Sequence, residues 1–406
     1  MNKEKWSIYL TILISALGYF VDIYDLLLFG IVRVPSLRAL GVPEDQMLAK
    51  GIMLLNAQMA GLLVGGIIWG VLGDRRGRKS VLFGSILLYS LANIANAFVP
   101  NPEVYAILRF VAGIGLAGEL GAAITLVSEI MSKESRGYGT TIVASVGILG
   151  AVAGSMIGDY FDWKIAYLVG GFMGLSLLAL RAGLLESGMF DSMRSQEVAR
   201  GHFHQLFLNP QRLGRYLCCI LIGVPIWYVI GILITFAPEL SRELGVDGIP
   251  TGSKSIMWSY IGLSLGDLSS GLLSQWLKSR RQSVLVFLTL MSLLIVVYVR
   301  QSGWSVNEFY ALCAAIGFSA GYWAVFVTIG AEQFGTNIRA TVATTVPNFV
   351  RGSVVPVTLS FKALQGPLGT ITAVWVVGAG VMVIAFTALY FLRETYGEDL
   401  DYFETI

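Results

Sequence analysis

Several ionisable side chains lie inside long apolar stretches of this 406-residue chain, and five of them are its clearest candidates for chemistry: Asp22, Asp25, Arg109, Glu119 and Arg351. A charged group in an apolar segment is costly, so such residues usually face a water-filled cavity or one another. Desolvation favours the neutral form of a carboxyl, whereas a nearby guanidinium favours the ionised form. An acid that alternately gains and loses contact with an arginine can therefore bind and release a proton.

Asp25 and Arg109 are predicted to lie at compatible depths. Asp22 and Asp25 are three residues apart, which places them on one face of a helix. Asp25 lies about 10 Å from the outer end of its expected span, and Arg109 lies about 6 Å from the start of its own. A proton site and a fixed salt bridge that only orients two helices both fit this spacing. Asp22, nearer the middle of the span, stays a second candidate for the titrating group or for a substrate contact.

Two further charged groups are predicted near the middle of their spans. Glu119 lies about 21 Å from the outer end of its helix and is a candidate second proton site. Arg351 lies roughly 16 Å from the inner face. A planar guanidinium at that depth suits a carboxylate or phosphate, and an internal salt bridge is the alternative. The candidates for the remaining polar and stacking contacts with a substrate are Asn56, Gln58, Trp227, Tyr228, Tyr322, Trp323 and Asn348, for which a packing role is the alternative.

The composition excludes a soluble fold. Hydrophobic residues make up 55% of the chain and charged residues 13%, about half the usual fraction of about 25%. The mean hydropathy is +0.71. A helix needs about 20 apolar residues to cross a bilayer, and twelve such stretches are expected, near 7–32, 52–73, 80–99, 105–130, 138–158, 164–185, 215–237, 254–277, 283–300, 307–331, 340–361 and 369–392.

These spans predict an all-α polytopic membrane protein with two pseudo-symmetric six-helix bundles. The expected domains are a bundle at 1–185, a cytoplasmic linker at 186–214, a second bundle at 215–392 and a cytoplasmic tail at 393–406. Of the 28 basic residues, 18 fall on the side of both termini and the linker, 8 on the other side and 2 within spans. Both termini are therefore expected to be cytoplasmic.

Several classes of function lack the residues that they need. The net charge of +2 gives no reason to expect a nucleic-acid partner. His202 and His204 lie in one polar loop, and the three cysteines lie in apolar runs, so no metal site is expected. No phosphate-binding GxxxxGK[ST] motif occurs, and no cofactor is implied. No cleavable signal peptide is expected, because the first apolar run is too long.

An offset of 203 residues relates three separate patches of the two halves. It carries Glu129 and Arg136 onto Glu332 and Arg339, Ala117-Gly118 onto Ala320-Gly321, and the run Ser80-Val81-Leu82 onto Ser283-Val284-Leu285. Structural repeats of this kind place a substrate site at their interface, near the middle of the membrane. Under the same offset Glu119 corresponds to Tyr322, so a carboxylate and aromatic rings are expected to line a shared cavity.

The loop from Gly70 to Lys79 reads GVLGDRRGRK and resembles the signature of the major facilitator superfamily, GxxxDRxGRK between spans two and three. The run from Arg109 to Gly115 is similar to that superfamily's RxxxGxG pattern in helix four. Glu119 with its flanking glycines resembles the metabolite:proton symporters, the Asp22/Asp25 pair resembles the aromatic-acid:proton symporters, and Arg393 to Leu400 resembles the ending of sugar porters. The run Val224-Pro225-Ile226-Trp227 replaces the glutamine-rich sugar motif, which argues against a hexose.

The resemblance implies roles for individual residues. In proton-coupled sugar porters an aspartate and an arginine at the positions of Asp25 and Arg109 form a pair across two helices. A charged latch that favours one conformation is implied for Gly70, Asp74, Arg75, Gly77 and Arg78, with a simple positive-inside anchor as the alternative. An intracellular charge network is implied for Glu129, Arg136, Glu332 and Arg339, with plain helix-end charges as the alternative. Asp267 is expected to join the inner latch with the loop from Lys278 to Arg281.

The resulting expectation is a monomeric secondary transporter of a bacterial inner membrane. It would carry a small organic, anionic metabolite together with protons by alternating access. An uncoupled facilitator or an exporter on the same fold remains the alternative. A polytopic membrane enzyme lacks a nucleophile or metal motif, and a transporter-like sensor would need a large soluble extension.

Overall fold

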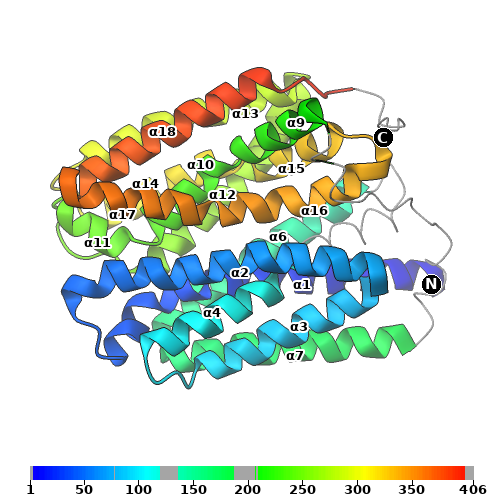
Figure 1. The fold of residues 1–406 in the computed structure, drawn as a ribbon, viewed down its shortest axis with the longest axis horizontal. Helices are drawn as coiled ribbons and strands as arrows, with labels where there is room; N and C mark the ends of the chain where they lie inside the picture. The colour runs from blue at the N-terminus through cyan, green and yellow to red at the C-terminus, as the bar shows by residue number, and fades with distance from the viewer. Residues whose placement is uncertain (1–2, 77, 119–135, 187–205, 207–208, 398–406) are drawn as a thin grey trace. The chain divides into compact units, whose positions relative to one another are not determined.

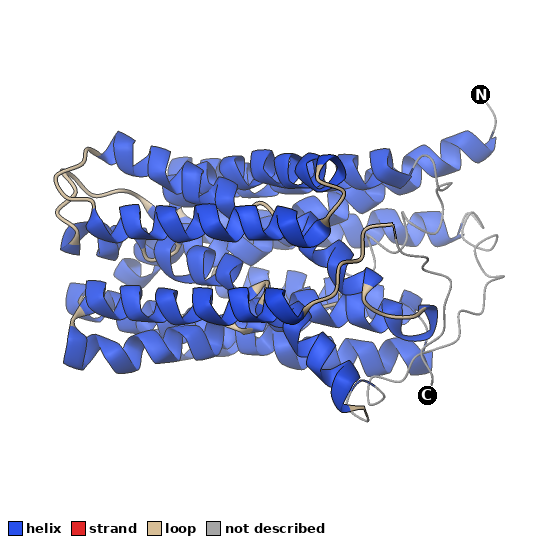
Figure 2. Cartoon of the chain, turned by 90° about the horizontal axis from the view of Figure 1, so that it is seen from above, coloured by secondary structure: helices blue, strands red, loops and turns tan. Residues whose placement is uncertain are grey.

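The computed structural model describes residues 3–76, 78–118, 136–186, 206 and 209–397, and within these ranges the side chains at several positions near 3–12, 70–82, 136–145, 183–186 and 336–344 lie outside the description. The chain divides into two compact units, residues 1–199 and 200–406. The described ranges are helical apart from short loops and one isolated β-bridge between Asp247 and Ser305 (Figure 2).

The described part of unit 1 consists of long helices, with short connections from α1 to α4 and from α6 to α7 (Figure 1). Its helices are α1 (Lys3–Ala39), α2 (Met47–Arg76), α3 (Arg78–Asn96), α4 (Pro102–Leu116), α6 (Arg136–Tyr160) and α7 (Trp163–Glu186), with a short 3-10 turn at Glu44–Gln46. Asn101 caps α4 by accepting a hydrogen bond from the backbone N–H of Val104, and Pro102 follows at the first helical position. This cap fixes the point at which α4 begins, one helical turn before Tyr105 and two before Arg109.

In the described part of unit 2, several of the long helical segments are broken. Its elements are α9 (Pro210–Leu221), α10 (Val224–Tyr228), a π-helical turn (Val229–Ile234), α11 (Ala237–Glu243), α12 (Gly252–Trp276), α13 (Arg280–Arg300), α14 (Val306–Ala320), α15 (Trp323–Glu332), α16 (Thr336–Gly352), α17 (Val354–Leu368) and α18 (Thr370–Phe391). The predicted spans 215–237, 307–331 and 340–361 are therefore each interrupted. Asn209 caps α9 at Pro210, inside the stretch 186–214.

Two of these breaks meet in space. The Tyr322 hydroxyl, between α14 and α15, donates to the carbonyl oxygen of Ile222, between α9 and α10, at 2.8 Å. A Cβ on the adjacent Gly223 would lie 2.8 Å from side-chain atoms of Phe326 and Val350. Gly223 therefore permits close packing of the α9/α10 joint on α15 and α16.

The two units repeat the same packing. In unit 1, Gly61 and Gly65 of α2 press against the carbonyls of Phe110 and Ile114 in α4; in unit 2, Gly262 and Gly266 of α12 press against the carbonyls of Ala314 and Phe318 in α14. A Cβ at any of these four glycines would come within 3.0 Å of a carbonyl oxygen, closer than real Cβ atoms approach. Small residues thus let the two helices of each pair approach closely.

A second correspondence involves a buried tyrosine in each unit. The Tyr24 hydroxyl donates to the carbonyl of Ala166 at 2.8 Å, and the Tyr228 hydroxyl donates to that of Val374, also at 2.8 Å. Four residues after each carbonyl comes a glycine, Gly170 or Gly378, that packs on the tyrosine ring or hydroxyl. Tyr24 corresponds to Tyr228 and Phe110 to Ala314, so the offset is 204 residues for α1 and α4. The glycines of α2 and α7 correspond to those of α12 and α18 at offsets of 201 and 208.

Seven helical segments in the described residues are long and apolar enough to cross a membrane, by length and composition: Leu13–Ala39, Glu44–Trp69, Trp163–Ala182, Pro210–Ile234, Arg280–Arg300, Val306–Glu332 and Thr370–Phe391. The segment Val146–Tyr160 is apolar but shorter. A membrane-spanning helix satisfies its backbone hydrogen bonds internally, which explains why the described ranges contain no β-sheet.

Candidate functional site

A buried polar cluster lies inside unit 1, where α1, α4 and α7 meet. At its centre the Asp25 carboxyl is fully buried, and neither of its oxygens has a hydrogen-bond partner. Its Oδ1 atom lies against Gly170 of α7, so closely that a Cβ at that position would come within 3.0 Å of it. The charges of Asp22 and Arg109 act on this carboxyl, although Asp25 and Arg109 make no direct ion pair.

Arg109 is the cationic member of the cluster and is also fully buried. Its Nη1 donates a long hydrogen bond of 3.5 Å to the side-chain oxygen of Asn93 on α3. Its guanidinium carbon lies 5.7 Å from the ring centre of Phe29 and 5.6 Å from that of Tyr167. The Nε and Nη2 atoms have no hydrogen-bond partner. Arg109 is thus held by two aromatic faces and keeps two donors for a further acceptor.

Tyrosine hydroxyls join the helices around this cluster. The hydroxyls of Tyr105 and Tyr167 lie 2.5 Å apart, and the Tyr105 hydroxyl is 3.4 Å from Ser36 Oγ. The rings of Phe29 and Tyr105 pack edge to face at 5.8 Å, as do those of Tyr105 and Tyr167 at 5.9 Å. These contacts tie α1, α4 and α7 together and fix the rings on which Arg109 rests.

Asp22, Gln58 and Arg33 extend the buried polar group. Asp22 is fully buried one turn before Asp25 on α1. Gln58 on α2 donates to the carbonyl of Leu26 at 3.2 Å, so its amide nitrogen serves to hold α2 against α1. Arg33 is fully buried as well, and the sequence analysis missed it because the first span was expected to end at residue 32. The observed helix continues to Ala39.

The unit 2 residues predicted to bind substrate are buried, except for Trp323, which is half-buried, and two of them use their hydroxyls in structural contacts. The hydroxyls of Tyr228 and Tyr322 donate hydrogen bonds to the carbonyl oxygens of Val374 and Ile222, respectively. Arg351 is 1% exposed, and its guanidinium carbon lies 6.0 Å from the ring centre of Trp323. Trp227 is 4% exposed, and its indole N–H has no hydrogen-bond partner.

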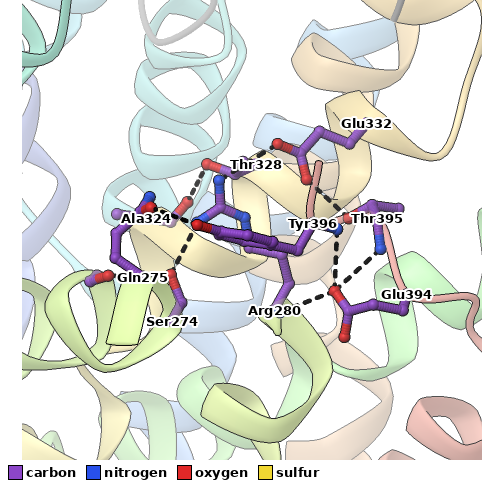
Figure 3. A network of polar contacts seen from close by, with 10 residues as sticks. Ser274, Gln275, Arg280, Ala324, Thr328, Glu332, Glu394, Thr395 and Tyr396 are labelled. Atoms are coloured by element: carbon purple, nitrogen blue, oxygen red, sulfur yellow. Dashed lines mark hydrogen bonds and ion pairs between the residues drawn. The ribbon is translucent and has the colours of Figure 1, made fainter. Parts of the chain in front are cut away.

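A second polar network lies at the end of unit 2 that carries the C-terminal segment (Figure 3). The Glu394 carboxylate accepts from the Ser279 hydroxyl, from the backbone N–H of Arg280 at 2.8 Å and from that of Arg281 at 3.2 Å. Glu332 accepts from the Thr395 hydroxyl at 2.7 Å and from Arg280 Nη2 at 3.4 Å. The chain after α18 thereby fastens the start of α13 to the end of α15.

Arg280 and Gln333 complete this network. Arg280 Nη1 donates to Ser274 Oγ at 2.7 Å, and its guanidinium carbon lies 5.4 Å from the Tyr396 ring centre. Gln333 donates to the carbonyl of Arg393 at 2.7 Å. Partial burial raises the pKa of the Glu394 carboxyl, but the hydrogen bonds from Ser279 and from backbone N–H groups outweigh it and hold that pKa below its ordinary value.

The comparisons with known proteins decide the family. A family model described as the Major Facilitator Superfamily matches residues 9–370 of the chain. The chain belongs to this superfamily. It is 27% identical over 341 residues to the 3-(3-hydroxy-phenyl)propionate transporter of Escherichia coli, with 81% of each chain covered. It is 26% identical over 326 residues to the niacin transporter NiaP of Acinetobacter baylyi, with 72% of this chain and 73% of that one covered.

A solved structure shows the same fold. The D-xylose–proton symporter has a TM-score of 0.69 at 15% sequence identity, covering 97% of this chain and 100% of that one. The prediction of an all-α polytopic membrane protein with the twelve-helix major facilitator fold is thus confirmed. The relatives in this superfamily are transporters. The protein is likewise a membrane transporter of small molecules and not an enzyme.

The loop that carries the superfamily resemblance is only partly described. Gly70, Asp74 and Arg75 lie in the last turns of α2, Arg78 begins α3, Arg136 begins α6 and Arg339 lies in α16, but the side chains of these residues lie outside the described part. Gly77, Glu119 and Glu129 lie outside the described residues altogether. Glu332 is the member of the predicted charge network whose contacts are visible. Asn56 on α2 is half-buried, and Asn348 on α16 is buried.

The expectation for Asp267 is wrong. Its Oδ1 accepts from the backbone N–H of Ala324 at 3.0 Å and so caps the start of α15, rather than contacting the loop from Lys278 to Arg281. The reason is a tight packing of α12 on the α14/α15 joint, where a Cβ on Gly321 would lie 2.5 Å from the Asp267 backbone nitrogen. Asp267 is therefore a helix cap in this state.

Proposed function

We propose that this superfamily member is a proton-coupled symporter of a small organic anion, with Asp25 as the proton site and Arg109 as its fixed cation. The observation that carries the proposal is the Asp25 carboxyl, fully buried with both oxygens unpartnered beside a buried guanidinium. An ionised carboxylate without partners is very costly to bury, and such a group takes up a proton instead. In a state where the carboxylate reaches the free Nε and Nη2 donors of Arg109, it would release that proton.

The repeat supports a functional rather than a structural role for this pair. With the offset of 204, Asp25 corresponds to Val229 and Arg109 to Cys313, both fully buried in unit 2. Unit 2 keeps the tyrosine-to-carbonyl bond and the glycine packing without either charge. The fold of one half therefore does not require an acid and an arginine at these positions. Burying a charged pair is costly. Because packing does not need this pair, we attribute it to the binding and release of a proton.

Arg351 and Trp323 support an aromatic carboxylate as the substrate. A guanidinium binds a carboxylate through two parallel hydrogen bonds, and the Trp323 ring and the unpartnered Trp227 indole N–H offer stacking and donor groups. Niacin and 3-(3-hydroxyphenyl)propionate, named for two relatives, are both aromatic carboxylic acids. The remaining parts of the proposal are a monomer in the bacterial inner membrane, with both termini cytoplasmic and the Glu332 network latching the cytoplasmic end.

The experiment uses proteoliposomes containing the purified full-length protein and two matched solutes, nicotinate and its neutral amide. Nicotinate should accumulate only under an inward proton gradient, and nicotinamide should not. Asp25→Asn should abolish gradient-driven accumulation while leaving exchange of internal for external nicotinate. A facilitator would show the same uptake with and without the gradient, and that result would reject proton coupling.

The double variant Asp25→Val with Arg109→Cys gives unit 1 the residues of unit 2 and serves as the folding control. It should be produced and extracted as a folded protein without proton-driven uptake. If neither nicotinate nor a wider panel of aromatic carboxylates is transported, the substrate class is wrong even where the fold is intact.

A further inference from the structure

A notch in α7, opposite Asp25, is formed where Gly170 lacks a side chain. We propose that Gly170 is a positioning residue for the proton site: it holds the Asp25 carboxyl in this notch, away from Arg109, in the proton-loaded state. The inference rests on the proposed function and names a part of the site that residue type alone would not suggest. It concerns unit 1 only.

The notch has no room for a side chain at position 170 while the Asp25 carboxyl occupies it. A Cβ there would come within 3.0 Å of Asp25 Oδ1 and would lie 2.9 Å from Cε1 of Tyr24. The Tyr24 ring is held in place, because its hydroxyl donates a hydrogen bond to the carbonyl of Ala166, which lies on α7 one turn before Gly170. The clash with an added methyl group would therefore be relieved by movement of the Asp25 carboxyl.

The surroundings determine where the carboxyl would go. Asp22 and Tyr24 from α1, Arg109 from α4 and Tyr167 from α7 are the titratable groups whose charges act with that of Asp25. On the other faces, α2 contributes the Gln58 amide, which is bonded to Leu26, and α6 presents Gly150 and Gly154 to the backbone and ring of Phe20 and Tyr24. Arg109 is the group among these with unpartnered donors.

Unit 2 shows what the same notch does without an acid. A Cβ on Gly378 would lie 2.5 Å from the Tyr228 hydroxyl, so that glycine accommodates only the tyrosine, and position 229 is a buried valine. In unit 1 the glycine accommodates both the tyrosine ring and the neighbouring carboxyl. The notch is thus a common element of the repeat that unit 1 also uses to hold its acid.

The test is an infrared pH titration of the purified protein in lipid vesicles, without substrate. The carbonyl stretch of the protonated Asp25 carboxyl is identified as the band lost in Asp25→Asn. In Gly170→Ala the carboxyl is pushed toward Arg109, which favours its ionised form. The midpoint of the band should then fall by about one pH unit, a tenfold loss of proton affinity. An unchanged or raised midpoint would overturn the proposal.

Gly154→Ala is the matched control for crowding around Tyr24. Its Cβ would lie 3.4 Å from Cδ2 of the same ring and 3.1 Å from the flexible end of Ile31, so its nearest contacts are with these two side chains rather than with Asp25. The control should leave the midpoint where it is in the unaltered protein. The titration contains no substrate, so it tests the role of Gly170 separately from transport. An unchanged midpoint can occur together with proton-driven nicotinate uptake, and a lowered midpoint can occur without such uptake.

A double variant covers the case in which Gly170→Ala does not fold. Asp25→Ala removes the carboxyl from the notch and should restore folded Gly170→Ala protein, or raise its melting temperature above that of the single variant. If Gly170→Ala is equally unstable with and without the carboxyl, the notch serves Tyr24 alone and the positioning role is refuted.

Discussion

Removal of the Glu394 carboxyl is expected to destabilise unit 2 selectively. In Glu394→Ala the start of α13 loses its side-chain acceptor for the N–H groups of Arg280 and Arg281. Loss of a helix cap costs about 0.5 to 2 kcal/mol, and loss of a negative charge at a helix N-terminus costs about 0.3 to 1 kcal/mol. The sum, roughly 1 to 3 kcal/mol, lowers the melting temperature by about 2 to 12 °C for a cooperative unit of this size.

The natural cysteines make this measurement specific to one unit. Cys218, Cys219 and Cys313 all lie in unit 2, and the last two are fully buried. A thiol-reactive dye added to detergent-solubilised protein during heating therefore reports the opening of unit 2. The reaction of these thiols should shift to lower temperature in Glu394→Ala.

The matched control is Glu308→Ala, which removes another carboxylate cap from the same unit. Glu308 forms a capping box with Ser305 at the start of α14, in an exposed position. It binds no other helix, so its removal should shift the melt less than Glu394→Ala does. Equal melting temperatures for Glu394→Ala and the unaltered protein would refute the view that the C-terminal segment fastens α13.

Two further predictions use the same melting assay. The pKa of Glu394 is lower in the folded protein than the ordinary value of 4.5, so its stabilising effect is present above that value and is lost as the pH falls through the folded pKa. The difference in melting temperature between the unaltered protein and Glu394→Ala should be constant from about pH 6 to 8 and should disappear below about pH 4. A difference in melting temperature that grows in acid would contradict this. Asp267→Ala, which removes the cap of α15, should cost about 1 kcal/mol, whereas Asp267→Asn retains a capping oxygen and should melt close to the unaltered protein.

Much of the architecture could be predicted from composition, because a bilayer requires apolar helices of a set length. The common depth of Asp25 and Arg109 followed from counting residues along two helices, and both side chains lie in one buried cluster. Counting could not show which groups Arg109 contacts. Its cation–π contacts with Phe29 and Tyr167 come from helices brought together by tertiary packing.

The remaining differences arise from features that apolar length does not encode. Arg33 lies just beyond the predicted first span of 7–32, yet the helix continues to Ala39 and Arg33 is fully buried. Asp267 lies eleven residues before Lys278 on α12, roughly 16 Å along that helix, and only the close approach of Gly321 shows that its partner is α15. The side chains of the latch loop near Asp74 lie outside the described part, so their roles stay predictions.

The two repeated units differ in the continuity of their first helix. The first helix of unit 1 runs unbroken for 37 residues, whereas its counterpart in unit 2 is divided into α9, α10, a π-helical turn and α11. Each joint already lacks regular backbone bonds, so bending there sacrifices few of them. The unbroken helix holds Asp22 and Asp25 on one continuous segment, whereas the corresponding segment of unit 2 can bend at its joints. Motion of the first helix in unit 1 is therefore expected to be that of a rigid body, and motion in unit 2 to be concentrated at the joints.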